Sequence, residues 1–221
     1  MKATSSRSLK SSNLKWLVLL AVLDAVVALF LVSPEMIDGI TLTKLAVMRA
    51  LGTAVLPVVV LVLTGLLPNN VKTMLVFWKV ASPLPGSEAI TKHGPADTRI
   101  DMAALKKNVG ALPTDPADQN AKWYKLYRMV ADDVGVAEAH KLFLMYRDMA
   151  AMSLPLIVVV PLGLWIAGAN TLAGWISAGI LLVQYMATAL SARHSGVRFV
   201  CNVLAIHSTR KVSAPKAGAA S

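Results

Sequence analysis

Residues 16–32 read WLVLLAVLDAVVALFLV, so 16 of these 17 side chains are apolar and Asp24 is the exception. A helix needs about 20 apolar residues to cross a bilayer core, within a usual range of about 17 to 25. The stretch is longer than the apolar segment of a signal peptide, which has about 7 to 15 residues, and Ser33-Pro34-Glu35 offers no cleavage site. We therefore interpret residues 16–32 as transmembrane helix 1.

Three further apolar stretches predict transmembrane helices 2, 3 and 4, at residues 45–67, 150–168 and 172–191. The composition agrees, because 56% of the residues are hydrophobic and 15% are charged, whereas about a quarter are charged in an ordinary globular protein. The single cysteine excludes an internal disulfide and a zinc site built on cysteines. The expected fold class is an all-α integral membrane protein with four transmembrane helices.

The charges predict the orientation of these helices. The terminal segments 1–15 and 192–221 are basic, whereas residues 33–43 contain two acidic residues and no basic one. Basic segments favour the cytoplasmic side of a membrane. We therefore expect both termini in the cytoplasm of a bacterium, a multi-pass protein in its inner membrane, and two external connections, the loop 33–44 and the turn 169–171.

Residues 68–149 resemble soluble protein, with eleven Lys or Arg and nine Asp or Glu. Asp101 and Asp115 are suited to cap two helices, and a third helix from about Val136 continues into transmembrane helix 3 without a breaker. Pro83 and Pro85 predict an extended segment at residues 82–87, followed by more irregular chain. We expect a small helical module, inserted between transmembrane helices 2 and 3 on the cytoplasmic side.

Aromatic and apolar side chains recur at helical spacing in this module, and we expect them to form a cytoplasmic interaction face. The members of this face are Trp123, Leu126, Tyr127, Phe143 and Tyr146. Phe77 and Trp78 end an amphipathic stretch that begins at Asn69. This stretch fits either a helix at the level of the lipid headgroups, with both aromatic residues interfacial, or the inner end of transmembrane helix 2.

The expected transmembrane helices carry polar residues that we interpret as one intramembrane network. Asp24 lies nine residues past Lys15, hence roughly 13 Å into the membrane, where an ionisable group normally faces protein or water. We expect neutral Asp24 to donate a hydrogen bond to Thr53 or Gln184. The full network is Asp24, Arg49, Thr53, Ser177, Gln184 and Thr188. A role in helix packing is favoured over an ion or proton path.

The sequence contains no motif for catalysis, for a cofactor or for a metal. His93, His140, His194 and His207 show no ligand spacing, and we expect them to be exposed or capping. Cys201 is expected to be a small packed residue, with lipid modification as the alternative. No catalytic, cofactor-binding or metal-ligating residue is therefore predicted.

These observations predict a non-enzymatic membrane protein that presents its helical module to a cytoplasmic protein partner, beside anionic lipid headgroups. The alternative is an oligomeric pore or membrane-perturbing effector of the bacterial stress or phage-defence type, which would require a homo-oligomer. Nucleic-acid binding is disfavoured, because residues 68–149 carry a net charge of only +2.

Overall fold

The computed structural model describes residues 9–32, 65–166 and 168–210, together with Val55, Val59 and Val62. All regular elements in these residues are helices, which confirms the expected all-α class for the described part of the chain. The chain divides into two compact units. The first unit contains residues 1–76 and 144–190, and the second contains residues 77–143 and 191–221.

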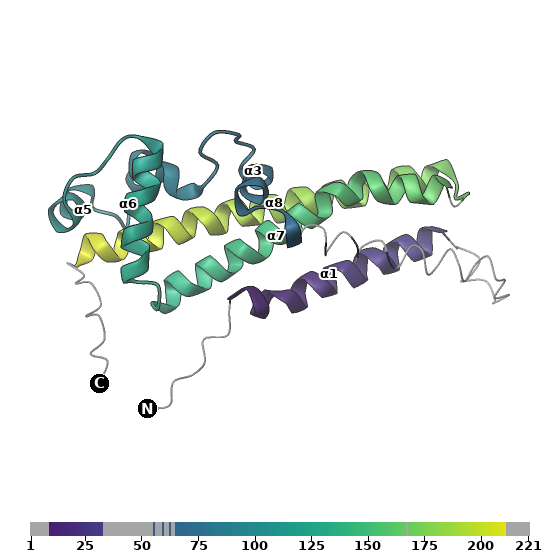
Figure 1. Cartoon of the computed structure of the whole chain (residues 1–221), viewed down its shortest axis with the longest axis horizontal. Coiled ribbons are helices and arrows are strands. Elements are labelled where there is room, and N and C mark those ends of the chain that lie inside the picture. Colours follow the sequence, from purple (N-terminus) through teal and green to yellow (C-terminus); the bar gives the residue numbers. More distant parts are fainter. Residues whose placement is uncertain are drawn as a thin grey trace, which may run out of the picture. The chain divides into compact units, whose positions relative to one another are not determined.

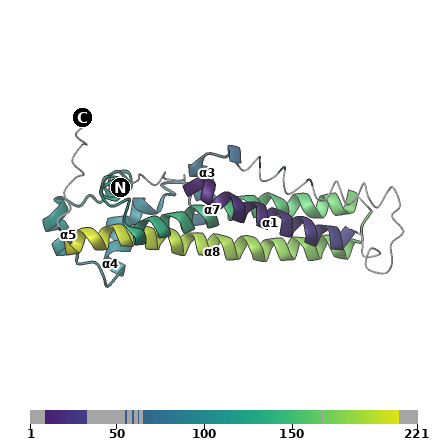
Figure 2. The ribbon, with the colours of Figure 1, turned by 90° about the horizontal axis from the view of Figure 1, so that it is seen from below.

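The first unit is built on three long helices. These are α1 (Leu9–Val32), the later part of α7 (Val134–Ile166) and the earlier part of α8 (Thr171–Thr209). Helix α3 (Asn69–Phe77) contributes all but its last residue. In this unit α7 and α8 lie side by side and are joined by a short turn, and α1 runs along them (Figures 1 and 2). The turn uses Gly168 at a φ of +79°, which glycine adopts without steric cost.

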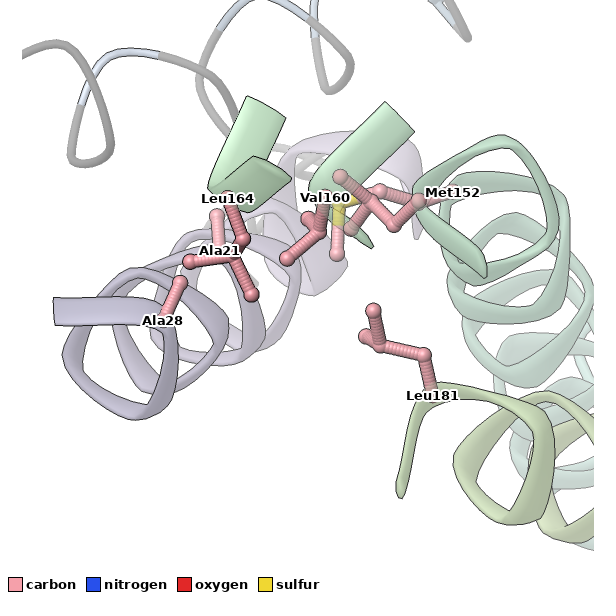
Figure 3. Packing of buried hydrophobic residues seen from close by; sticks show 7 residues of the cluster. Ala21, Ala28, Met152, Val160, Leu164 and Leu181 are labelled. Carbon is pink, nitrogen blue, oxygen red and sulfur yellow. The ribbon is translucent and has the colours of Figure 1, made fainter. Parts of the chain in front are cut away.

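Small residues of α1 form part of the core of the first unit. Ala21 and Ala28 are seven residues apart and both are buried, so they lie on one face of the helix. They pack against aliphatic side chains of α7, including Val160 and Leu164, and the cluster also contains Leu181 of α8 (Figure 3). The short alanine side chains allow the helix backbones to approach closely.

Among the described residues, α7 and α8 are long and apolar enough to cross a membrane. Only 44% and 28% of their most apolar stretches are buried, whereas a core helix of a soluble protein would be mostly buried. Helix α8 has 39 residues and is therefore roughly 58 Å long, almost twice the thickness of a bilayer core, about 30 Å. The expected transmembrane helix 2, residues 45–67, lies outside the described residues except for three valines and residues 65–67.

The second unit contains two helices that the sequence predicts correctly, α5 (Met102–Val109) and α6 (Pro116–Met129). The Asp101 carboxylate accepts hydrogen bonds from two backbone amides of the first turn of α5. Asp115 does the same for α6. These caps satisfy amides that have no partner inside their own helix.

The segment between α3 and α5 is more helical than expected. Leu84 is extended, but Pro85 begins a 3₁₀ turn, η2 (Pro85–Glu88). A π-helix, η3 (Ala89–His93), and a single α-turn, α4 (Gly94–Ala96), follow. A proline fits the first position of a helix because its missing amide would have no partner there. The expected extended and irregular chain is therefore wrong for residues 85–96, whereas residues 97–101 are irregular as expected.

Gln119 of α6 holds this segment in place. Its side chain is only 1% exposed, and its Oε1 accepts hydrogen bonds from the amides of Ile90 and Thr91 at 2.9 and 3.1 Å. Its Nε2 donates to the carbonyl of Thr114 at 2.8 Å. The first amides of a helix need an acceptor outside that helix. Gln119 therefore caps η3, although it lies 29 and 28 positions after Ile90 and Thr91 in the sequence.

The end of α8 belongs to the second unit and corrects the expected basic tail at residues 192–221. The helix continues to Thr209, and its residues Phe199, Val200, Val203, Leu204 and His207 are buried. Their spacing places them on one face of a helix, which packs into the unit, while Arg198 on the same helix is exposed. The expected boundary at residues 149 and 150 likewise lies inside the continuous helix α7.

Candidate functional site

The candidate site in the first unit is a group of polar side chains contributed by all three long helices. Asp24 of α1 is buried, and its Oδ2 accepts a hydrogen bond of 3.2 Å from Nε2 of Gln184 on α8. The same Nε2 donates to Oγ of Ser153 on α7 at 3.0 Å. Ser153 in turn donates to the carbonyl of Met149, also at 3.0 Å. The structure therefore brings Asp24 and Gln184 into direct contact and adds Ser153, which the sequence analysis missed.

The direction of this hydrogen bond differs from the expectation. We expected Asp24 to donate, but Gln184 donates and Asp24 accepts. The reason lies in Ser153. Its hydroxyl hydrogen is directed to the Met149 carbonyl, so its oxygen can only accept from Gln184. The amide nitrogen of Gln184 is thereby turned toward both Ser153 and Asp24.

The other expected members of the intramembrane network lie apart from this group or outside the described residues. Ser177 donates to the carbonyl of Gly174 at 2.8 Å. Thr188 donates to the carbonyl of Gln184 at 2.8 Å, so both hydroxyls are satisfied by the backbone of their own helix. Arg49 and Thr53 lie outside the described residues.

A cavity of about 100 Å³ adjoins the polar group. Its wall contains Asp24, Gln184 and Ser177, and the remaining surface is formed by aliphatic side chains of α1, α7 and α8. Ser177 is one of the residues that line this space, and its hydroxyl bonds to its own helix. Asp24 and Ser177 thus lie on the wall of one cavity.

A second polar group of the first unit consists of three buried ions. Nζ of Lys72 lies 3.3 Å from Oδ1 of Asp148, and Nη2 of Arg147 lies 2.9 Å from the same oxygen. The side chains of Lys72, Arg147 and Asp148 are 4%, 5% and 11% exposed. Such burial costs several kcal/mol per ion, which the mutual attraction must offset. The sequence feature that could have indicated this ion group is the charged pair Arg147-Asp148, just before the apolar stretch that begins at Ala150.

Three residues of the expected interaction face do not lie at the surface of the second unit. Trp123, Leu126 and Phe143 are buried, so their expected exposure is wrong. Trp123 makes an edge contact with Phe199 of α8, with the ring centroids 5.0 Å apart. Tyr127 makes a similar contact with Phe199 at 5.1 Å. The aromatic stripe of α6 is therefore core, because the end of α8, which the sequence analysis treated as a tail, covers it.

Tyr146 and the two expected interfacial residues occupy different surroundings. Tyr146 is half-buried in the first unit. Phe77 packs against Phe143, with the ring centroids 6.3 Å apart. Trp78 is half-exposed with a φ of +53°, a conformation that is uncommon for a bulky residue. The guanidinium of Arg193 lies 3.4 Å from the centroid of the Trp78 ring, a cation–π contact that holds Trp78 in place.

The histidines and the cysteine of the second unit also correct the sequence analysis in part. His207 is buried rather than exposed, and its Nε2 lies 3.0 Å from the carbonyl of Leu126. His93, Asp97 and Cys201 line a common pocket of about 280 Å³. Burial lowers the pKa of His93, and the neighbouring Glu88 opposes that shift. Cys201 is buried, and a buried structural thiol is inert, so this pocket lacks an activated nucleophile.

No group of three or more His, Cys, Asp or Glu side chains among the described residues could hold a metal ion. Comparison of the chain with protein-family models, curated proteins and solved structures finds no match.

Proposed function

We propose that the protein is a non-enzymatic, multi-pass protein of the bacterial inner membrane that presents its second unit to a cytoplasmic protein partner. The observation that carries the membrane assignment is the apolar surface of the first unit. Leu19 of α1 is 57% exposed, Val158 of α7 is 64% exposed and Val183 of α8 is 70% exposed. Many exposed aliphatic side chains on several helices indicate a surface that contacts a membrane or another protein, and we assign this one to lipid.

The proposed topology has four transmembrane helices and cytoplasmic termini. Helices α1, α7 and α8 provide three of the four, and residues 45–67 provide the other. The charge distribution supports the orientation, because the strongly basic segments 1–15 and 192–221 both lie on the proposed cytoplasmic side. The second unit, with its capped helices and its mixture of acidic and basic residues, then lies in the cytoplasm.

Single cysteines test this topology in a Cys201→Ser background. Ala111 and Thr209 are suitable positions because both are exposed in the second unit, so a lack of labelling cannot be caused by burial. An impermeant thiol reagent applied to intact cells should label a cysteine at Gly39 and leave Ala111→Cys and Thr209→Cys unlabelled. Permeabilised cells are the control, since both positions should then react. Labelling of Ala111→Cys in intact cells would overturn the topology.

The outer side of α6 is the proposed contact surface for the partner. Tyr124 is half-exposed, and Lys125 and Arg128 are exposed beside it. The neighbouring Tyr124 raises the pKa of the Arg128 guanidinium. Tyr and Arg are the residues most often found at energetically important positions of protein interfaces. This surface replaces the buried aromatic stripe that the sequence suggested.

Purification in a native detergent followed by mass spectrometry tests the interaction. The wild-type protein should recover one cytoplasmic protein in stoichiometric amount, and Tyr124→Ala should reduce that recovery by about tenfold, the effect of a loss of about 1.4 kcal/mol. Lys106→Ala is the matched control, because Lys106 is exposed on α5 of the same unit. Repeated recovery of the protein alone, or equal recovery with Tyr124→Ala, contradicts the proposal.

The arrangement of polar residues favours this function over an oligomeric pore. Such a pore needs polar side chains directed outward between subunits, whereas Asp24, Ser153 and Gln184 are directed toward one another within one chain. We expect no conductance in planar bilayers. Currents that change with Gln184→Leu would support the pore instead.

A further inference from the structure

We propose that the cavity beside Asp24 holds water and makes Asp24 a site that takes up and releases protons inside the apolar unit. The ligand is thus a proton delivered by water. This inference concerns α1, α7 and α8 alone and is independent of the partner proposed for the second unit.

The cavity is large enough for water and has the polar groups that water requires. Its volume is about 100 Å³, and one water occupies about 30 Å³ in the liquid, so about three fit. Ordered water needs about two to four polar partners. Asp24, Ser177 and Gln184 line the space and supply three. An entirely aliphatic cavity of this size would stay dry.

The hydrogen bonds of the site leave the required acceptors directed to water. Gln184 uses Nε2 for its bonds to Asp24 and Ser153, and its Oε1 is the acceptor that remains. Asp24 receives the amide through Oδ2, so Oδ1 is available to water. Ser177 has used its hydroxyl hydrogen on Gly174, and its oxygen can still accept.

Both protonation states of Asp24 have a partner in this arrangement. The ionised carboxylate accepts from the Gln184 amide and from water, while the neutral carboxyl donates its proton to water and still accepts from Gln184 through Oδ2. An aspartate enclosed only by aliphatic side chains would be held in its neutral form. The combination of a fixed donor and a hydrated space therefore allows Asp24 to exchange protons, which a purely structural hydrogen bond would not require.

Ser177 indicates the side from which water reaches Asp24. It lies seven residues before Gln184 on α8, which is roughly 10 Å along the helix, in the direction of the turn that joins α7 to α8. The ion group formed by Lys72, Arg147 and Asp148 lies in the opposite direction along α7. Water therefore enters past Ser177, and closing this part of the cavity should isolate Asp24.

Modification by dicyclohexylcarbodiimide tests the proposal, because this apolar reagent forms a stable adduct with neutral carboxyl groups inside membranes. In the purified full-length protein, peptide mass spectrometry should locate an adduct on Asp24. Its rate of formation should fall by about tenfold or more between about pH 5 and about pH 9 as Asp24 ionises. Ser177→Val, which removes the hydroxyl and narrows the cavity, should hold Asp24 in its neutral form and so weaken this fall of the rate with pH, whereas Thr188→Val on the same helix should leave the fall unchanged. Asp24→Asn should give no adduct.

Infrared spectroscopy supplies a second readout that does not depend on reagent access. The carboxyl band of neutral Asp24, identified by its absence in Asp24→Asn, should shift within minutes of transfer from H₂O to D₂O. No adduct on Asp24 at any pH would overturn the proposal, and so would modification at one rate throughout the pH range. A Ser177→Val protein that behaves like wild type, or a carboxyl band that does not shift in D₂O, would also overturn it.

Discussion

Replacement of Gln119 by leucine should selectively loosen the segment that precedes α4. Gln119 is buried and its amide group satisfies two backbone amides and one carbonyl. Leucine has a similar volume and fills the space, so packing changes little. It provides neither an acceptor for Ile90 and Thr91 nor a donor for Thr114. The substitution therefore removes hydrogen bonds without creating a large cavity.

The magnitude follows from the burial of the three groups. A buried polar group that loses its partner costs about 1 to 3 kcal/mol. The bond to the Ile90 amide is buried, whereas the bonds to Thr91 and Thr114 are partly buried and water can partly replace them. We expect a total of about 3 kcal/mol, which corresponds to a change of about two orders of magnitude in an equilibrium constant.

Hydrogen exchange followed by mass spectrometry measures this effect locally. A peptide that spans η2 and η3 should exchange about 100 times faster in Gln119→Leu than in wild type. Gln119→Glu is the matched control, because a carboxylate keeps the acceptor and favours a helix N-terminus, and it should show a smaller effect. Unchanged protection of this peptide in Gln119→Leu would refute the assignment of Gln119 as the cap of η3.

Three further predictions concern single side chains. Asp24→Leu should destabilise the first unit by about 1 kcal/mol, the scale of an interhelical hydrogen bond in a membrane, while Asp24→Asn keeps the acceptor and should be nearly neutral. Reversible unfolding in mixed micelles measures the stability of both variants, and equal stabilities of Asp24→Leu and Asp24→Asn would contradict the prediction. Asp148→Asn should cost about 3 to 5 kcal/mol because it removes the charge from a carboxylate in a buried ion group, whereas the exposed Asp118→Asn should cost little in the same assay. Burial lowers the pKa of His93, so the unfolded chain binds more protons and stability falls as the pH drops below about 6.5. Hydrogen exchange of η3 should show this loss, and His93→Gln should reduce it without removing it, because burial also lowers the pKa of His207 in the same unit. A wild-type profile without a step, or one that His93→Gln leaves unchanged, would count against the prediction.

The elements that the sequence predicts correctly are those whose signals are local. Asp101 and Asp115 cap α5 and α6 through amides two and three residues away. Gly110, directly after α5, has a φ of +82°, which glycine adopts readily. Such interactions lie within one turn of helix, so a single sequence suffices to recognise them.

The sequence predictions fail where the packing or hydrogen-bond partner of a residue comes from a distant part of the chain. The aromatic stripe of α6 is buried only because Phe199 covers it. The residues near Trp123 in the sequence do not indicate this contact. The apolar repeat around Val203 and Leu204 was the available signal, but the basic residues of the same segment concealed it. Ser153 was missed for the same reason, since a lone serine in an apolar stretch has no pattern.

The separation between Asp24 and Gln184 has a consequence for the synthesis of the protein. In the proposed topology the twelve Leu, Val and Phe residues of residues 16–32 favour insertion by about 4 to 7 kcal/mol, more than the cost of a central aspartate, about 2.5 to 3.5 kcal/mol. Transmembrane helix 1 therefore enters the membrane alone. Its partner is encoded 160 residues later, which takes roughly 10 to 30 s at about 5 to 20 residues per second. Throughout this interval the carboxyl group is displayed to membrane chaperones and proteases, and a chain truncated before α8 would never hide it.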